Sequence, residues 1–190
     1  MTRKHHFLFL EKIYSTPQEV PFQANDNIRV VSTGPKCSAI VTNKGDLYVT
    51  GQNRGQRLLI KGSKILKAFT KAKRGIRDIQ CGPSYSILLK TDGQIVNIGN
   101  EIERKVKIPE KMQILSIATC KGQEKAKNFG LCVTKSGHVY QWNTSDYSKH
   151  EDGIMPKLVD IGQDYKVICL SAEKQYFVVA VEKSVVSAYN

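Results

Sequence analysis

Long apolar runs are missing from this 190-residue sequence. The N-terminal run Phe7–Leu10 holds four apolar residues, and no window reaches the roughly 18 that a membrane-spanning helix needs. The same run is too short for the core of a secretory signal, and no small-residue cleavage site follows it. We therefore expect no membrane span and a protein of the cytoplasm or the nucleus.

Paired cysteines are also missing. The chain has five cysteines, an odd number, and no two of them show the C-x-x-C spacing. Each lies in a run of apolar and β-favouring residues, which predicts buried free thiols in a reducing compartment. The five are Cys37, Cys81, Cys120, Cys132 and Cys169.

Catalytic and metal-binding motifs are sparse. The stretch Gly51–Gln56 is glycine-rich, but it follows an expected strand without opening a helix, so it predicts a turn and not a phosphate loop. None of the four histidines stands at metal-ligand spacing. A Cys132–His138 nucleophile pair is conceivable, yet Cys132 lies within an apolar run where a thiolate is poorly solvated. We expect no enzyme, no metal and no cofactor.

Acidic residues are too few to balance the basic ones. The sequence has 29 Lys and Arg against 17 Asp and Glu, a net charge of +12. This balance favours an acidic partner: nucleic acid, an acidic protein face or an anionic membrane. The net charge alone does not distinguish among these three kinds of partner.

What the sequence does have is an internal repeat. Residues 28–51 and residues 76–99 share seven identities without a gap, at an offset of 48. A third copy begins at Ile114, and a degenerate fourth copy runs from Tyr165 to the end. A period of this size predicts a solenoid or a propeller.

Each copy has the pattern of short β-strands. Apolar runs rich in β-branched residues alternate with tight polar turns that end in Gly45, Gly93 and Gly137. Glycine at that position supplies the positive φ that a hairpin turn needs. The fold class is therefore predicted to be all-β.

The best-preserved copy carries a specific motif. It reads Gly34, Ser38, Gly45, Leu47, Tyr48, Gly51, Asn53, Gly55 and Gln56. This pattern resembles the repeat of the regulator of chromosome condensation family, and the later copies match it with declining quality. The resemblance implies a β-propeller of four-stranded blades, usually about seven of them. It also implies a guanine-nucleotide-exchange-factor-like interaction protein, because some relatives act on small GTPases.

About four copies are present, at approximately 28–75, 76–113, 114–164 and 165–190. Either the chain is a partial propeller with covered edges, or a strand at Phe7–Ile13 in the N-terminal segment 1–27 completes a terminal blade. The remaining blades would then come from a partner, from self-association or from further sequence. Only one segment, Gly62–Gly75, is compatible with a helical turn or two.

The positive charge is concentrated in one connector between repeats. Residues 52–75 hold eight basic residues and no acidic one, whereas residues 143–164 hold two basic and five acidic residues. The functional interpretation is a docking site for an acidic partner, and the alternative is a loop kept soluble by its lysines. The candidate partner-binding residues are Arg54, Arg57, Lys61, Lys64, Lys67, Lys71, Lys73 and Arg74.

Two functions follow from these features. The first is a non-enzymatic interaction or scaffolding module whose partner is a protein, either a small GTPase or another acidic protein face. The second is nucleic-acid or chromatin binding through the 52–75 connector, with a steep salt dependence. The aromatic residues fall mostly in strands, which indicates packing between blades and not a platform for stacking bases.

Overall fold

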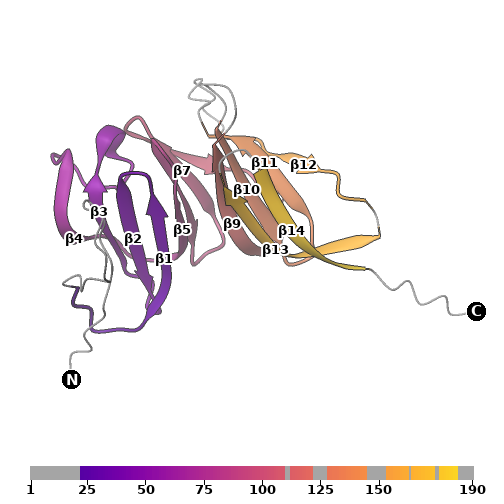
Figure 1. The fold of residues 1–190 in the computed structure, drawn as a ribbon, viewed down its shortest axis with the longest axis horizontal. Coiled ribbons are helices and arrows are strands. Elements are labelled where there is room, and N and C mark those ends of the chain that lie inside the picture. Colours follow the sequence, from indigo (N-terminus) through magenta and orange to yellow (C-terminus); the bar gives the residue numbers. More distant parts are fainter. Residues whose placement is uncertain are drawn as a thin grey trace, which may run out of the picture.

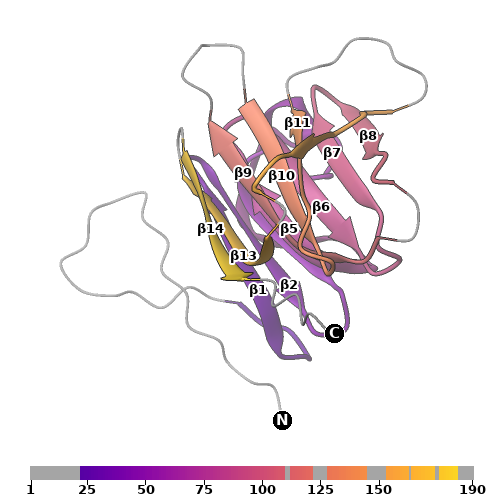
Figure 2. The same cartoon turned by 90° about the vertical axis from the view of Figure 1, so that its right-hand side faces the viewer.

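The computed structural model describes residues 22–109, 112–121, 128–144, 153–162, 164–173 and 176–183. Its strands form antiparallel sheets that follow one another in chain order, and we call the sheets blades 1 to 4 (Figure 1). The first strand of each blade lies beside the first strand of the next (Figure 2). The predicted strand at Phe7–Ile13 lies outside the described residues.

Blades 1 and 2 each contain four strands in sequential order. Blade 1 consists of β1 (Ile28–Gly34), β2 (Cys37–Thr42), β3 (Leu47–Gln52) and β4 (Ile65–Lys73), with the short 3₁₀ helix η1 (Arg54–Gln56) before β4. Blade 2 consists of β5 (Ile76–Cys81), β6 (Tyr85–Lys90), β7 (Ile95–Gly99) and β8 (Ile102–Val106).

Blade 3 again has four strands, and the described part of blade 4 has two. Blade 3 consists of β9 (Ile114–Lys121), β10 (Asn128–Thr134), β11 (Val139–Asn143) and β12 (Lys157–Val159). Blade 4 is the hairpin of β13 (Tyr165–Glu173) and β14 (Tyr176–Lys183). The all-β propeller fold predicted from the repeat is confirmed.

The segment Gly62–Gly75 forms an edge strand and no helix. β4 pairs antiparallel with β3, from Gln52 opposite Ile65 to Leu47 opposite Lys73. The connectors recognised in the sequence thus contain the fourth strand of each complete blade. The predicted turn glycines do adopt positive φ, at 82° for Gly45, 87° for Gly93 and 92° for Gly137.

A β-bulge in the first strand fixes the register of every blade. The extra residue is Arg29 in blade 1, Arg77 in blade 2, Leu115 in blade 3 and Ile168 in blade 4. A bulge leaves one residue unpaired, so it marks an equivalent position in each repeat. The degenerate fourth copy can therefore be aligned with the other three copies residue by residue.

The core consists of apolar clusters between successive blades. Val41 and Ala39 of blade 1 pack with Ile79 and Leu88 of blade 2. Ile87 and Leu89 of blade 2 pack in the same way with Ile117 and Cys132 of blade 3. Blades 2 and 3 therefore each bury one face against the preceding blade and the other face against the next.

One carboxylate lies within these interfaces. Asp78 stands directly after the bulge of β5, and its Oδ1 accepts a hydrogen bond of 2.7 Å from the backbone N–H of Ile79. Burial outweighs this bond and raises the pKa of Asp78 to about 6. Because the folded-state pKa lies above the ordinary value of 3.8, the folded state binds more protons than the unfolded state between these pH values. The free energy of unfolding should therefore rise as the pH falls from about 6 towards 4.

Asp78→Asn is expected to raise the free energy of unfolding by about 1–3 kcal/mol near pH 7.5, because it removes the charge and keeps the acceptor. It should also remove the contribution of this residue to the pH dependence. Urea denaturation of both proteins at about pH 7.5 and pH 5 measures this. Asp92→Asn, at an exposed turn, is the matched control. If both variants changed the free energy of unfolding equally near pH 7.5, the raised pKa of Asp78 would be refuted.

Candidate protein-interaction site

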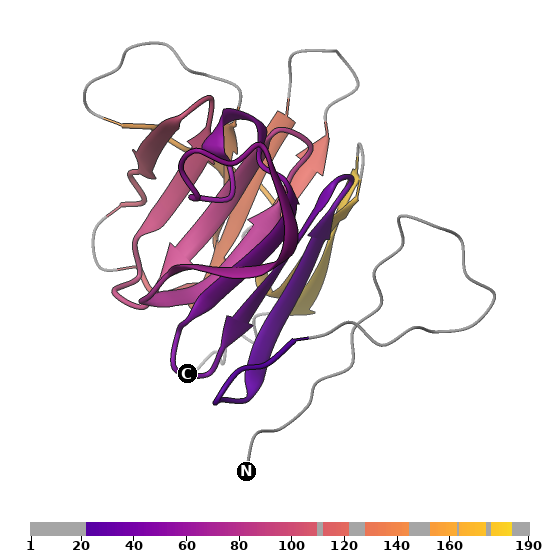
Figure 3. The same ribbon diagram turned by 90° about the vertical axis from the view of Figure 1, so that its left-hand side faces the viewer.

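The loop that joins β3 to β4 is organised by a buried asparagine. We call residues 53–64 the exit loop; it lies at the upper end of blade 1 in Figure 3. The Asn53 side chain donates from Nδ2 to the carbonyls of Ile60 (2.5 Å) and Ser63 (2.9 Å). Its Oδ1 accepts from the backbone N–H of Leu58 at 2.9 Å. The asparagine of the repeat motif therefore holds both halves of the loop with one amide group.

Arg57 ties the exit loop to blade 2. Its Nε donates to the carbonyl of Gln52 at 3.0 Å, and its Nη1 donates to the carbonyls of Gly82 (3.2 Å) and Pro83. The backbone N–H of Glu101 in blade 2 also donates to the carbonyl of Gly55 at 2.7 Å. These bonds make the loop a fixed part of the surface.

The same contacts exclude Arg57 as a contact residue for a partner. Its side chain is only 2% exposed, because its guanidinium is directed at buried carbonyls. The sequence counted Arg57 among the partner-binding residues on its charge alone. The structure gives it the role of positioning the loop.

The remaining seven basic residues fall into two groups. Arg54, Lys61 and Lys64 are exposed on the exit loop, and Lys67 is exposed near the start of β4. Lys71 and Lys73 lie at the other end of β4 and Arg74 follows that strand, since the six steps from Lys67 to Lys73 span up to about 20 Å in an extended strand. A single patch of eight cations is therefore not formed.

The second group is matched by carboxylates. Lys71 Nζ lies 2.6 Å from Asp46 Oδ2, and Arg74 Nε lies 3.5 Å from Asp46 Oδ1. Lys73 Nζ lies 3.1 Å from Glu103 Oε2. Exposed pairs of this kind contribute about 0–1 kcal/mol each to stability, but they neutralise charge. Lysines on β4 also discourage pairing of this edge strand with another chain.

The basic residues of the first group are not paired with carboxylates in the described part of the chain. Among the residues that the structure describes, Arg54, Lys61, Lys64 and Lys67 make no ion pair. We call these four residues the exit-loop cations. They combine exposure, a fixed backbone and unneutralised charge, so the docking interpretation applies to this end of blade 1.

The surroundings of the cysteines do not favour a nucleophilic thiolate. Burial raises the pKa of Cys132 to about 12, which keeps its thiol protonated, while His138 is an exposed turn residue that contacts Ser136. A hydrogen bond from Cys81 lowers the pKa of Cys37 to about 7, but both thiols are buried. Cys169 is exposed, which corrects the expectation that all five thiols are buried.

Metal-ligating side chains do not cluster in the described ranges. Within them, no three His, Cys, Asp or Glu side chains come together in a way that could hold a metal ion. No helix in the same ranges is long and apolar enough to cross a membrane.

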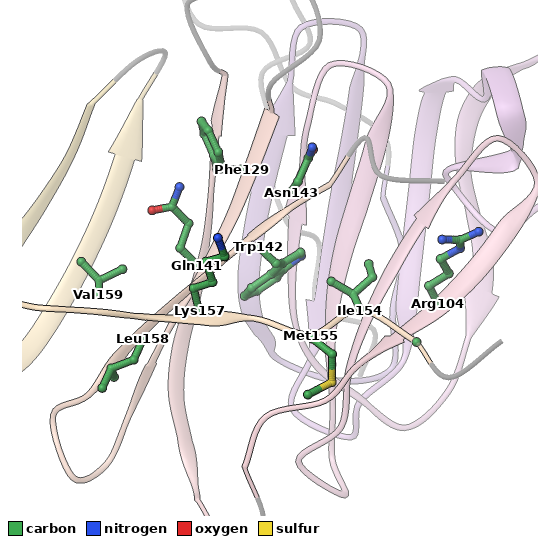
Figure 4. A pocket seen from close by; sticks show the side chains of 11 residues that line it. Arg104, Phe129, Gln141, Trp142, Asn143, Ile154, Met155, Lys157, Leu158 and Val159 are labelled. Atoms are coloured by element: carbon green, nitrogen blue, oxygen red, sulfur yellow. The ribbon is translucent and has the colours of Figure 1, made fainter. Parts of the chain in front are cut away.

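A cavity of about 760 Å³ opens between the outer strands of blades 2 and 3 (Figure 4). Arg104 of β8, Trp142 of β11 and Leu158 of β12 contribute to its wall. The indole of Trp142 lies over Gly130, and its buried Nε1 has no hydrogen-bond acceptor among the residues that the structure describes. None of the eight basic residues predicted from the sequence lines this cavity. No sequence motif indicated it, because its wall is assembled from separate elements.

The arrangement of strands defines a class: a repeat-type β-propeller, of which blades 1 to 4 are a part. No family model matches the chain. The solved structure of human WBSCR16 superposes with a TM-score of 0.71 at 16% identity, over 94% of this chain and 50% of that one. Yeast RCC1 (Prp20) bound to Kap60 superposes with a TM-score of 0.67 at 15% identity, over 92% of this chain and 46% of that one.

Curated relatives agree with this class. The chain is 27% identical over 150 residues to the secretion-regulating guanine nucleotide exchange factor of Bos taurus, which covers 70% of this chain and 32% of the relative. It is 29% identical over 171 residues to the E3 ubiquitin-protein ligase HERC2 of Homo sapiens, over 80% of this chain and 4% of the relative. The chain thus spans about a third of the exchange factor and about half of the solved propellers. The resemblance to the regulator of chromosome condensation repeat is confirmed.

Proposed function

We propose that this chain is a non-enzymatic protein-interaction module whose exit loop docks onto an acidic protein surface. The observation that supports this most is the state of the exit-loop cations, which are exposed and make no ion pair within the described part of the chain. Three of them lie on the loop fixed by Asn53 and Arg57, and Lys67 follows it on β4. A preorganised loop loses little conformational entropy on binding. Complementary charge accelerates association and selects the partner.

A small GTPase is the partner class that we propose. The Bos taurus and Mus musculus relatives, 27% and 29% identical, are named as guanine nucleotide exchange factors. A further structural neighbour, Prp20p of Saccharomyces cerevisiae, is described as having binding properties to Gsp1p and histones. Exchange needs no covalent chemistry: a rigid loop that binds beside the nucleotide favours the nucleotide-free state. We expect a protein with this role in the cytoplasm or the nucleus.

The test uses a panel of purified small GTPases loaded with fluorescent GDP. Binding is measured by interferometry and GDP release by fluorescence, each at low and high salt. We expect one GTPase to bind with an affinity that falls with salt. Charge reversal by Arg54→Glu, Lys61→Glu and Lys64→Glu together should weaken that binding about tenfold to a hundredfold.

The matched control changes the same number of charges elsewhere. Lys44→Glu, Lys135→Glu and Lys183→Glu together affect exposed lysines on three different blades. This control should bind within about threefold of the unchanged protein, because long-range effects of net charge are screened. Equal losses in both triple variants would show that only net charge matters and would refute docking through the exit loop. Lys71, Lys73 and Arg74 are unsuitable for this purpose, since their reversal also breaks ion pairs.

Nucleic-acid binding is the second candidate, because the same four cations could contact phosphates. The exit loop contains no aromatic residue, so it offers no stacking platform for single strands. Fluorescence anisotropy with duplex DNA at two salt concentrations separates the candidates. Salt-sensitive DNA binding that the Arg54, Lys61 and Lys64 reversals abolish, with no GTPase bound, would replace the GTPase proposal.

A further inference from the structure

Blade 3 departs from the repeat at residues that line the cavity between blades 2 and 3. In blades 1 and 2 the second strand carries the motif serine, Ser38 or Ser86, opposite a residue smaller than tryptophan on the third strand. The equivalent pair in blade 3 is Gly130 opposite Trp142. A Cβ at residue 130 would overlap the indole ring, so Trp142 fits only because the serine is missing.

A second departure from the repeat lies beside the first. The motif glycine near the end of the third strand is Gly51 in blade 1 and Gly99 in blade 2, whereas blade 3 has Asn143 there, opposite Phe129. Phe129, Trp142 and Asn143 all line the cavity. The cavity therefore lies where blade 3 replaces residues of the repeat motif, and not at a position that the blades share.

The charge of the cavity wall has one sign. Among the described residues that line it, the charged side chains are Arg104 of β8 and Lys157 of β12, and no carboxylate is present. Glu103 precedes Arg104, but it pairs with Lys73, and successive side chains of a strand point to opposite faces. An occupant that carries a carboxylate therefore complements the charge of the wall.

Apolar side chains form much of the rest of the wall. Met155 is 69% exposed and Leu158 is 58% exposed, and both line the cavity with the buried Ile154 (Figure 4). The volume of about 760 Å³ lies in the range of ligand sites, which is about 300–1,000 Å³. An occupant with an aliphatic side chain would remove Met155 and Leu158 from water.

The cavity also offers hydrogen-bonding groups that suit a peptide backbone. β12 is the edge strand of blade 3, so one side of its backbone has no partner strand among the described residues. Trp142 Nε1 is a buried donor that lacks an acceptor in the same part of the chain. Such a donor is unfavourable, and the carbonyl of a peptide bound beside the ring would supply the acceptor. A free fatty acid has no amide groups for these positions.

We propose that this cavity binds an extended segment of a partner protein in which an acidic side chain stands beside an aliphatic one. The aliphatic side chain packs on Met155 and Leu158, and the carboxylate pairs with the cations of the wall. The backbone of the segment runs along the free edge of β12. The site belongs to blades 2 and 3, whereas the exit-loop cations belong to blade 1, so this inference does not rest on the proposed function.

The first experiment selects the ligand and locates it. Random ten-residue peptides displayed on phage are selected on the immobilised chain, and the enriched sequences are synthesised without tryptophan. Trp142 is the single tryptophan of the sequence, so its emission reports on the cavity. We expect the enriched peptides to carry an acidic residue next to an aliphatic one and to shift this emission saturably. Exchanging the acidic residue for its amide should weaken binding about tenfold.

The second experiment changes the wall. Lys157→Glu and Leu158→Asp should each weaken binding of the selected peptide about tenfold or more. Lys105→Glu and Ile102→Asp are the matched controls, because both residues are exposed on β8 and do not line the cavity. The controls should bind within about threefold of the unchanged protein. Circular dichroism checks that all four variants are folded.

Three results would overturn the proposal. The first is a selection that enriches no peptide, or only peptides without an acidic residue. The second is binding that Lys157→Glu and Leu158→Asp leave unchanged, because the peptide would then occupy another surface. The third is a shift of the Trp142 emission by octanoate but by no peptide, which would assign the cavity to a small carboxylate. The triple charge reversal in the exit loop should leave peptide binding unchanged, so failure of either site is recognised separately.

Discussion

Replacing Arg57 by methionine is expected to lower the free energy of unfolding by about 2–4 kcal/mol, although Arg57 is one of eight basic residues in a basic segment. The side chain is 2% exposed, and it donates to the carbonyls of Gln52, Gly82 and Pro83. Methionine fills much of the same space but cannot donate. The carbonyls around Arg57 would therefore remain buried without their donor, and the exit loop would lose its attachment to blade 2.

Urea denaturation followed by tryptophan fluorescence and circular dichroism measures this loss. Arg54→Met is the matched control, because Arg54 lies three residues earlier in the same loop and is exposed. It should change the free energy of unfolding by less than about 0.5 kcal/mol. If the two variants were equally stable, Arg57 would be a surface residue and the description of the loop would be wrong.

Gly51→Ala should lower the free energy of unfolding by about 3 kcal/mol or more. Gly51 has a φ of 100°, which L residues rarely adopt. An added Cβ would also lie 2.7 Å from Cys37 Cα and against the Lys36 carbonyl, both backbone atoms that cannot move aside. Strain and steric overlap therefore act together at the point where β3 meets the exit loop.

Gly62→Ala separates these two effects. Gly62 has a φ of 77°, but nothing lies within 4 Å of the position of an added Cβ. This variant should lose only about 1 kcal/mol, the cost of the backbone conformation. Thermal and urea unfolding of both variants give the difference. A loss at Gly51 no larger than that at Gly62 would contradict the close approach of β3 to the β1–β2 turn.

The repeated β-strands and turns could be predicted from the sequence because each of them depends on residues that are close together in the chain. Gly45, Gly93 and Gly137 are needed for positive φ in hairpin turns, and the strands between them are short and β-branched. Asn53 could be recognised as a motif residue, but its role could not, since its partners at Ile60 and Ser63 are fixed only by the folded loop.

The arrangement of the basic residues at the candidate site could not be predicted from the sequence. Eight basic residues that are close in sequence are divided in space, because β4 is extended and carries Lys71 and Lys73 away from the exit loop. The carboxylates that match them, Asp46 and Glu103, come from a hairpin turn and from blade 2. The burial of Arg57 depends on carbonyls some 25 residues further along the chain. Only its position next to the apolar run Leu58–Ile60 hinted at that burial.

The central claim is that a fixed loop presents the exit-loop cations to an acidic protein. Hydrogen–deuterium exchange of the chain with and without a bound small GTPase tests it most directly. The claim predicts slower exchange at residues 53–64 on binding and unchanged exchange at residues 71–74, where the cations are already paired. Slower exchange at residues 71–74, with the exit loop unaffected, would contradict it.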